Sequence, residues 1–203
     1  VEGVVCFDAS EKRLAIAKQK FPGLEVVKTY DELLARKDVT AIAIATPVST
    51  HYPLGMKALQ AGKHLLLEKP MAESVDQCRQ MIEVAEKNKL VLMVDHTFVY
   101  TGAVRKIKEL VENGRLGEIM YFDSVRVNLG LFQHDTNVVW DLAPHDLSIM
   151  DYIIGLEPTG VSAIGSTHFS DKEDIAYITV RYANQLLAHF HVNWMSPVKV
   201  RKI

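Results

Sequence analysis

Short apolar runs alternate with helical patterns through the first half of the chain. The runs are typical of buried strands, and they cover residues 1–7, 41–45, 64–67 and 90–94. The run at 41–45 is apolar at every position, which is expected of a central strand in a parallel sheet. This alternation predicts parallel strands that are joined by crossover helices.

Capping residues mark the helices between these runs. Ser10 and Ser74 each precede an amphipathic stretch, and a Thr-x-x-Glu capping box begins at Thr29. Another helix is predicted over residues 52–60 and is closed by Gly62. Each predicted strand is therefore followed by a helix, as a doubly wound sheet requires.

The pattern changes after about residue 96, where apolar and polar positions begin to alternate with a period of two. Such alternation predicts strands at residues 120–128, 159–169, 175–182 and 186–194, with a hairpin connection at 183–185. Helices are predicted at 103–112 and 144–154, the second closed by Gly155. Period-two strands with short connections are typical of an antiparallel sheet with one exposed face.

These patterns predict an α/β protein of two domains. Residues 1–100 form a Rossmann-type dinucleotide-binding domain with a parallel sheet. Residues 101–203 form an α+β domain whose sheet is open and largely antiparallel.

Composition and charge exclude several classes of function. The chain has 203 residues and a formal charge of -2, without a block of Lys and Arg, so neither a nucleic-acid groove nor an anionic membrane surface is indicated. No apolar run is long enough to span a bilayer, and the first residues lack a signal-peptide pattern, so we expect a cytoplasmic protein. Cys6 and Cys78 lie far apart without C-x-x-C spacing, which indicates free thiols.

Polar residues stand where two of the predicted strands end. Asp8 follows the first strand, where a carboxylate can accept hydrogen bonds from an adenosine ribose and repel a 2′-phosphate. Its local pattern by itself favours a capping aspartate. Thr46, Pro47 and His51 follow the run at 41–45 and lead into a helix N-terminus, which suits a phosphate, although the string alone is also an ordinary turn.

A charged pair follows the run at 64–67 directly. Glu68 and Lys69 stand at the predicted carboxyl edge of the sheet, and Pro70 restricts Lys69 to an extended backbone. A lysine at this edge can hydrogen-bond a substrate hydroxyl or carbonyl. A solvated strand end remains an equally good interpretation of this pair.

The densest group of chemically active side chains is Trp-Asp-Leu-Ala-Pro-His-Asp at residues 140–146. Asp141 and His145 are four residues apart and share a helix face, so the carboxylate can orient the imidazole for acid-base work. A metal site built from His134, Asp141, His145 and Asp146 is a second interpretation. A third has Asp141 as a helix cap and His145 packed against Trp140.

His189, His191 and Asn193 alternate with apolar residues along a late strand. A set with this spacing is favoured as the polar face of a sheet rather than as a ligand set.

The order of these motifs resembles the Gfo/Idh/MocA family, the glucose-fructose oxidoreductase and inositol dehydrogenase group. The resemblance covers essentially the whole chain. It rests on Ala45-Thr46-Pro47 with His51, Ala61-Gly62-Lys63-His64, Glu68-Lys69-Pro70, Gly114-Arg115-Leu116-Gly117-Glu118-Ile119, and Trp140-Asp141 with His145-Asp146.

The resemblance implies an NAD-dependent oxidoreductase that moves a hydride between nicotinamide and a sugar or sugar nucleotide. NADP is disfavoured because Asp8 would bind the adenosine ribose. Thr46, Pro47 and His51 would line the dinucleotide, with Glu68 and Lys69 beside the nicotinamide. Lys69 would also touch the substrate. The second domain, residues 101–203, would bind the substrate and form a homo-oligomer through its sheet.

The resemblance also assigns the acid-base chemistry. His145 would be the acid-base catalyst, Asp141 would tune it, and Lys69 would polarise the reacting oxygen. No metal is implied.

The family's G-x-G-x-x-G turn occurs nowhere in the sequence. We therefore expect a fragment that begins at the second strand of the Rossmann unit and stops before the family's usual end. A non-catalytic nucleotide-sensing or assembly protein with a degenerate Rossmann domain is the alternative function. A metal-dependent hydrolase built on the four residues of the metal interpretation is another.

Overall fold

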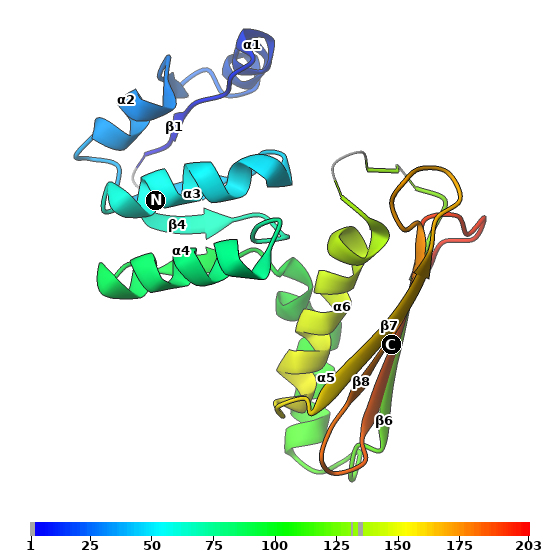
Figure 1. Cartoon of the computed structure of the whole chain (residues 1–203). Helices are drawn as coiled ribbons and strands as arrows, with labels where there is room; N and C mark the ends of the chain where they lie inside the picture. The colour runs from blue at the N-terminus through cyan, green and yellow to red at the C-terminus, as the bar shows by residue number, and fades with distance from the viewer. Residues whose placement is uncertain (1–2, 131, 134–135) are drawn as a thin grey trace. The chain divides into compact units, whose positions relative to one another are not determined.

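The computed structural model describes residues 3–130, 132–133 and 136–203. The chain divides into two compact units, Val1–Val94 and Asp95–Ile203. Each unit has its own cluster of buried apolar side chains. Figure 1 colours the chain from its N-terminus in blue to its C-terminus in red.

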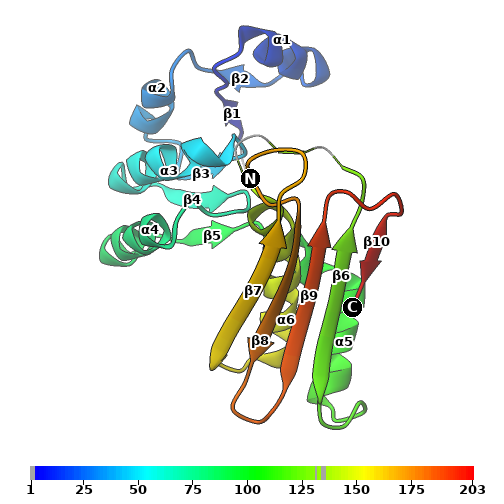
Figure 2. The ribbon, with the colours of Figure 1, turned by 45° about the vertical axis from the view of Figure 1, so that its right-hand side comes forward.

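The first unit contains two small parallel sheets. Strands β1 (Val5–Cys6) and β2 (Glu25–Val26) pair with each other. The other sheet has the order β3-β4-β5, with strands β3 (Ala41–Ile44), β4 (His64–Leu67) and β5 (Leu92–Val94), as Figure 2 shows. The parallel pairing confirms the predicted Rossmann-like sheet.

The position of β3 differs from its prediction as a central strand. Within the described residues it is an edge strand of its sheet, and β4 lies at the centre. Ile42 and Ile44 are buried, whereas Ala41 and Ala43 are exposed. Alanine is apolar but small, so a run of alternating Ala and Ile reads as fully buried in the sequence although it buries one face only.

Four α-helices lie between these strands: α1 (Glu11–Lys20), α2 (Tyr30–Ala35), α3 (His51–Gln60) and α4 (Val75–Lys87). A single 3₁₀ turn, η1 (Val48–Thr50), leads into α3. The predicted caps are confirmed, because the side chains of Ser10, Thr29 and Ser74 each accept a hydrogen bond from the backbone N–H three residues on. Gly62 closes α3 with a φ of 74°.

The core of the first unit lies between the helices and the β3-β4-β5 sheet. Leu59, Leu65, Leu67 and Met81 are almost fully buried there. Gly55 on α3 lets the helix approach the strands closely, because a Cβ at this position would lie 3.0 Å from Met81 Sδ and 3.1 Å from Leu65 Cδ2.

The second unit contains one five-stranded sheet of order β10-β6-β9-β8-β7. Its strands are β6 (Tyr121–Val127), β7 (Gly160–Ser166), β8 (Ile175–Arg181), β9 (Leu187–Asn193) and β10 (Val200–Lys202). Strands β6 and β9 pair in parallel and all other neighbours are antiparallel, which confirms the largely antiparallel sheet. The short strand β10 has no counterpart among the predicted elements.

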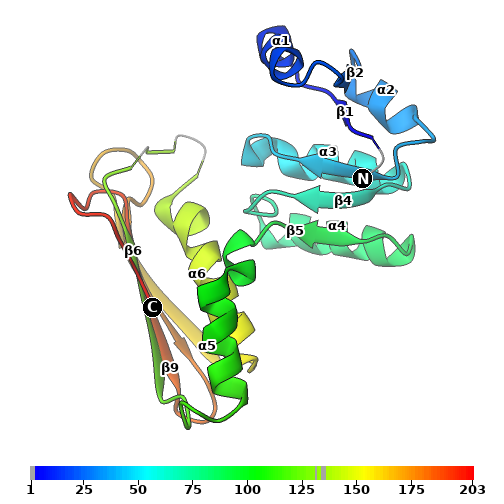
Figure 3. The same cartoon turned by 180° about the vertical axis from the view of Figure 1, so that it is seen from behind.

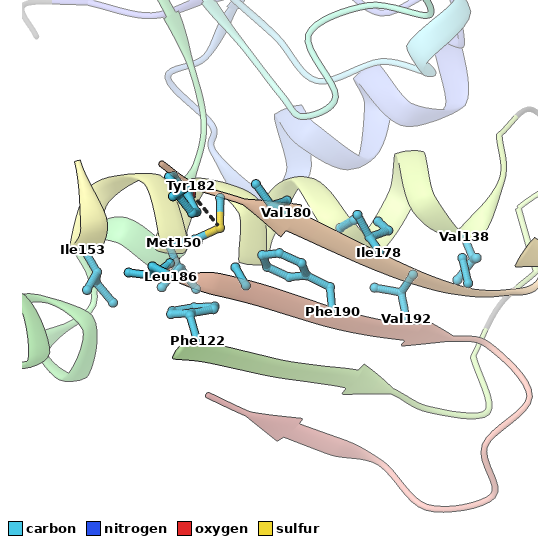
Figure 4. Packing of buried hydrophobic residues seen from close by; sticks show 14 of the residues in the cluster. Phe122, Val138, Met150, Ile153, Ile178, Val180, Tyr182, Leu186, Phe190 and Val192 are labelled. Carbon is cyan, nitrogen blue, oxygen red and sulfur yellow. Dashed lines mark hydrogen bonds between the residues drawn. The ribbon is translucent and has the colours of Figure 1, made fainter. Parts of the chain in front are cut away.

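Helices cover one face of this sheet. They are the 3₁₀ helix η2 (Thr97–Tyr100), α5 (Gly102–Glu112) and α6 (Val138–Ile154), and Figure 3 shows α5 and α6 against the strands. Phe190 and Ile178 of the sheet face Val138 and Met150 of α6 in the core drawn in Figure 4. Trp194 follows β9 and is 2% exposed.

Helix α6 begins six residues before its predicted start. Asn137 caps it by accepting a hydrogen bond from Trp140 N, and Pro144 lies inside the helix. The prediction began the helix at Pro144, and the first helical position is one that proline favours. Asp141 therefore lies in the first turn and is not the cap.

None of the helices in the described part of the chain is both long and apolar enough to cross a membrane. Cys6 and Cys78 are free and half-buried, and burial raises the pKa of the Cys78 thiol.

Candidate functional site

The ends of β3 and β4 form one polar edge in the first unit. The register pairs Ile44 with Leu67, so Thr46 and Lys69 each stand two residues beyond a paired position. Glu68 N–H donates to Ile44 O at 2.9 Å and extends the pairing of the two strands by one step. The structure therefore brings together Thr46, Glu68 and Lys69 at the carboxyl edge, as the sequence predicts for parallel strands.

Hydroxyl groups organise the turn after β3. Thr50 Oγ1 donates to Pro47 O at 2.7 Å, and Thr46 Oγ1 lies 2.6 Å from Thr50 Oγ1. Because Thr50 uses its hydroxyl hydrogen on Pro47 O, Thr46 is the donor of the second bond. Thr46 and Pro47 are both exposed, so this turn offers surface to a ligand.

His51 lies beneath this edge, with 1% of its surface exposed. Its Nδ1 lies 2.8 Å from Pro70 O and its Nε2 lies 2.8 Å from Thr46 O. The ring thus bridges the segments that follow β3 and β4. Carbonyl oxygens only accept, so a neutral ring donates to one of them and a doubly protonated ring to both. The sequence prediction placed His51 along a dinucleotide, whereas here the ring contacts the protein backbone.

Glu68 and Lys69 are half-buried. The carboxylate of Glu68 accepts a hydrogen bond from Lys69 N–H at 3.3 Å, and the peptide bond between Lys69 and Pro70 is cis. Both side chains therefore keep part of their surface accessible to solvent or to a ligand.

Asp8 stands after β1 and takes part in the turn into α1. Its Oδ1 accepts a hydrogen bond from Ser10 N at 2.8 Å, and its Oδ2 lies 3.8 Å from Arg13 Nη1. The Asp8 side chain is 32% exposed. Asp8 is thus a local turn residue, and its accessible carboxylate retains lone pairs for a ligand because each oxygen can accept two hydrogen bonds.

Asp141 and His145 occupy successive turns of α6 in the second unit. Asp141 Oδ2 accepts a hydrogen bond from Trp194 Nε1 at 3.2 Å, so a residue beyond β9 contacts the helix carboxylate. His145 is half-buried, and its ring meets the Phe98 ring edge-on at 4.8 Å between centroids.

A buried ion pair lies one residue further along α6. Arg126 donates from Nε to Asp146 Oδ2 at 2.8 Å and from Nη2 to Asp146 Oδ1 at 2.7 Å. The two side chains are 5% and 3% exposed. Arg126 also lies over Phe98, with its Cζ 4.5 Å from the ring centroid. Phe98 therefore has the arginine against its ring and His145 beside it.

This pair argues against Asp146 as a metal ligand, because the carboxylate is almost fully buried with both of its oxygens bonded to Arg126. His134 lies outside the described residues. Within the ranges that are described, no group of three His, Cys, Asp or Glu side chains could hold a metal ion.

The sequence interpretation missed Phe98, Arg126 and Trp194. Arg126 has the same strand parity as the buried residues Phe122 and Ser124, so the period of β6 does point it into the core. Trp194 likewise continues the buried positions Phe190 and Val192, but its partner Asp141 is distant in the sequence and has no local signal.

His189 and His191 lie on the sheet face opposite α6. The Tyr177 ring stacks on both, with centroid distances of 6.1 Å and 4.4 Å. Burial, and next the neighbouring His189, lower the pKa of His191. Leu187 and Tyr121 on the same face are 47% and 69% exposed. This face, defined by Tyr121, Tyr177, Leu187, His189 and His191, is hereafter the outer sheet face.

Comparison with known proteins gives two family matches that follow one another along the chain. The first is the family described as an oxidoreductase family with an NAD-binding Rossmann fold, named GFO_IDH_MocA, at residues 2–96. The second is the GFO/IDH/MocA C-terminal domain, at residues 104–202.

Two of the named relatives act on nucleotide sugars. A UDP-N-acetylglucosamine 3-dehydrogenase of Acidithiobacillus ferrooxidans is 32% identical over 164 residues, which is 79% of this chain and 50% of the relative. A dTDP-3,4-didehydro-2,6-dideoxy-alpha-D-glucose 3-reductase of Streptomyces violaceoruber is 31% identical over 160 residues, 73% of this chain and 45% of the relative. The chain thus spans about half the length of these relatives.

Solved structures match over nearly the whole chain. A structure of UDP-N-acetylglucosamine 3-dehydrogenase from A. ferrooxidans superimposes with a TM-score of 0.83 at 28% identity, covering 99% of this chain and 64% of that protein.

Proposed function

The chain belongs to the Gfo/Idh/MocA oxidoreductase family. From that premise we propose that it functions as an NAD-dependent dehydrogenase that acts on a sugar or sugar nucleotide. The observation that carries the proposal is the ordered edge after β3 and β4, where Lys69 is held half-buried beside Glu68 and an exposed turn. Parallel sheets of this type bind dinucleotides at their carboxyl edges. The two nucleotide-sugar relatives favour this substrate class.

The residues of the first unit fit a dinucleotide. Asp8 offers a partly exposed carboxylate to the adenosine ribose, and this negative charge favours NAD over NADP. Thr46 and Pro47 offer the exposed turn, with Glu68 and Lys69 beside it. We give His51 a supporting role, because it ties Thr46 O to Pro70 O below the edge. Nicotinamide, when bound, supplies the hydride chemistry.

The second unit supplies the proton chemistry in this proposal. His145 accepts the proton of a sugar hydroxyl, or returns it to a ketone in the reverse direction. Asp141 shares its helix face and stabilises the charged imidazole. Lys69 donates a hydrogen bond to the reacting oxygen and polarises it.

We also propose that the protein is a homo-oligomer assembled through the outer sheet face. Its exposed Tyr121 and Leu187 beside the stacked Tyr177 support an interface, since aromatic and apolar side chains are enriched in such contacts.

Substitution of Lys69 and His145 tests the function. We expect Lys69→Met and His145→Asn each to lower kcat for NAD reduction by roughly 100-fold or more, while NADH binding measured by calorimetry is retained. Lys57→Met is the matched control, because Lys57 is an exposed lysine on α3 whose ammonium group pairs with the exposed Asp31 at 3.2 Å. Saturable NADH binding without turnover of any sugar or sugar nucleotide would instead support the non-catalytic alternative.

A further inference from the structure

We propose that Trp194 is a positioning residue for Asp141, and this inference rests on the proposed function of Asp141 beside His145. Trp194 Nε1 donates to Asp141 Oδ2 at 3.2 Å, and the indole is 2% exposed. Asp141 is half-buried, and a hydrogen bond to a charged carboxylate is stronger than one between two neutral groups. It fixes the rotation of the carboxylate on α6.

Trp194 is itself held on several sides. Its backbone N–H donates to Asp174 O at 2.9 Å, and its carbonyl accepts from Gly130 N at 3.3 Å. The Phe132 ring meets the indole edge-on, at 5.9 Å between centroids. The indole therefore offers Asp141 a donor whose position is set by the surrounding structure.

The dipeptide Glu173-Asp174 ties both partners of this bond to one place. Glu173 O accepts from Val138 N at 2.9 Å, and Glu173 Oε2 accepts from Asn137 Nδ2 at 2.9 Å, so Glu173 holds the first turn of α6. Asp174 holds Trp194 through its own carbonyl. Glu173 thus holds the start of α6, which carries Asp141. Its neighbour Asp174 holds Trp194, which donates the hydrogen bond to Asp141.

The turn around Asp174 is rigid. Its carboxylate is fully buried and accepts from His168 N at 2.7 Å, from Phe169 N at 3.0 Å and from the His168 ring at 2.8 Å. These bonds hold His168 and Phe169 against Asp174. The contacts that hold the Trp194 backbone in place therefore do not involve Asp141.

If Trp194 has a structural role only, its substitution lowers the free energy of unfolding, and its effect on kcat is the same with or without the Asp141 carboxylate. If Trp194 positions Asp141, its substitution lowers kcat only when that carboxylate is present. The two roles are separated by a double-mutant cycle, because energetic coupling between contacting residues appears as non-additivity.

The kinetic experiment uses Trp194→Phe, which keeps an aromatic ring and removes the N–H donor. We expect kcat to fall roughly tenfold, in line with the loss of a hydrogen bond to a charged group, while KM for the sugar changes less than about twofold. The acid limb of the kcat-pH profile moves to lower pH, because the imidazolium loses its aligned carboxylate.

In the Asp141→Ala background, Trp194→Phe has no further effect on kcat. An equal fall in kcat in both backgrounds would overturn the proposal, and so would an unchanged kcat in the single variant. Tyr182→Phe is the matched control. It also removes a buried donor in the same core, since Tyr182 Oη donates to Met150 Sδ of α6 at 3.3 Å, but it does not touch Asp141.

A measurement on the contact itself requires neither turnover nor a folded Trp194 variant. The chain has two tryptophans, so its nitrogen-15 spectrum contains two indole N–H signals, which Trp140→Phe assigns. We expect the Trp194 signal to exchange with deuterium at least tenfold faster in Asp141→Ala and to be unchanged in Tyr182→Phe. Equal exchange in the wild-type protein and in Asp141→Ala would overturn the contact. Faster exchange in a protein without dehydrogenase activity would refute the proposed function while leaving the contact established.

Discussion

Replacing Asp146 with asparagine tests how the buried charge of Arg126 is tolerated. Arg126 and Asp146 form a two-bond pair at 2.7 Å and 2.8 Å with both side chains almost fully buried. The neutral amide introduced by Asp146→Asn would leave a buried guanidinium without a counter-charge. Breaking one partner of a buried pair costs about 3–5 kcal/mol of unfolding free energy. For a chain of this size that corresponds to a fall of roughly 6–20 °C in melting temperature.

Two further variants make the reasoning specific. Glu109→Ala breaks the exposed pair of Lys106 and Glu109, whose side chains are 59% and 57% exposed, and is expected to cost less than about 1 kcal/mol. The double variant Arg126→Met with Asp146→Leu removes both charges and is expected to recover most of the lost stability. The recovery is incomplete because the double variant also loses the contact of Arg126 with Phe98, which contributes about 0.5–2 kcal/mol.

Urea unfolding followed by circular dichroism measures all of these variants against the wild-type protein. The reasoning fails if Asp146→Asn unfolds within about 1 kcal/mol of the wild type. It also fails if the double variant is less stable than the single one, because the cost would then come from packing rather than from an unpaired charge.

Two other substitutions have clear directions. Asp8→Ser removes the negative charge at the ribose position while Arg13 remains nearby, so we expect the ratio of kcat/KM for NADP to that for NAD to rise at least tenfold, and an unchanged ratio would refute the role of Asp8. Burial, and next the neighbouring His189, hold the pKa of His191 below its ordinary value of about 6.5. As the pH falls through that value, His191 takes up a proton in the unfolded chain before it does so in the folded protein, and the folded state therefore loses stability. His191→Phe is expected to reduce the loss of unfolding free energy between about pH 7 and pH 5, and an unchanged slope of unfolding free energy against pH would contradict this.

The local signals in the sequence were sufficient for the element types. Strand β4 and the caps at Ser10 and Ser74 follow from patterns that span a few residues, and the structure has them as predicted. These features depend on backbone hydrogen bonds within one turn or on the alternation of side chains along one strand.

Features that depend on tertiary partners were not predictable in the same way. Pro144 reads as a helix start, yet Asn137 and Glu173 extend α6 upstream of it. Strand β10 has only three residues and exists because it pairs with β6. The edge position of β3 depends on which strands pair, and a single strand's sequence does not contain that information.

The candidate site shows the same division. The carboxyl-edge placement of Thr46 and Lys69 followed from parallel pairing alone. The backbone contacts of His51 and the indole partner of Asp141 required the folded chain, because each joins segments that are far apart in sequence.

The parallel pairing of β6 with β9 also determines when the second unit can fold. Both hydrogen-bonded neighbours of β6, which are β9 and β10, follow it only after α6, β7 and β8 in the chain. During synthesis β6 therefore has no strand to pair with until β9 has left the ribosome. The β3-β4-β5 sheet instead adds each strand to the one made just before it. Such local pairing closes quickly, whereas long-range pairing is slow. The first unit can thus form stepwise during translation, whereas β6 joins the second sheet only after β9 has been made.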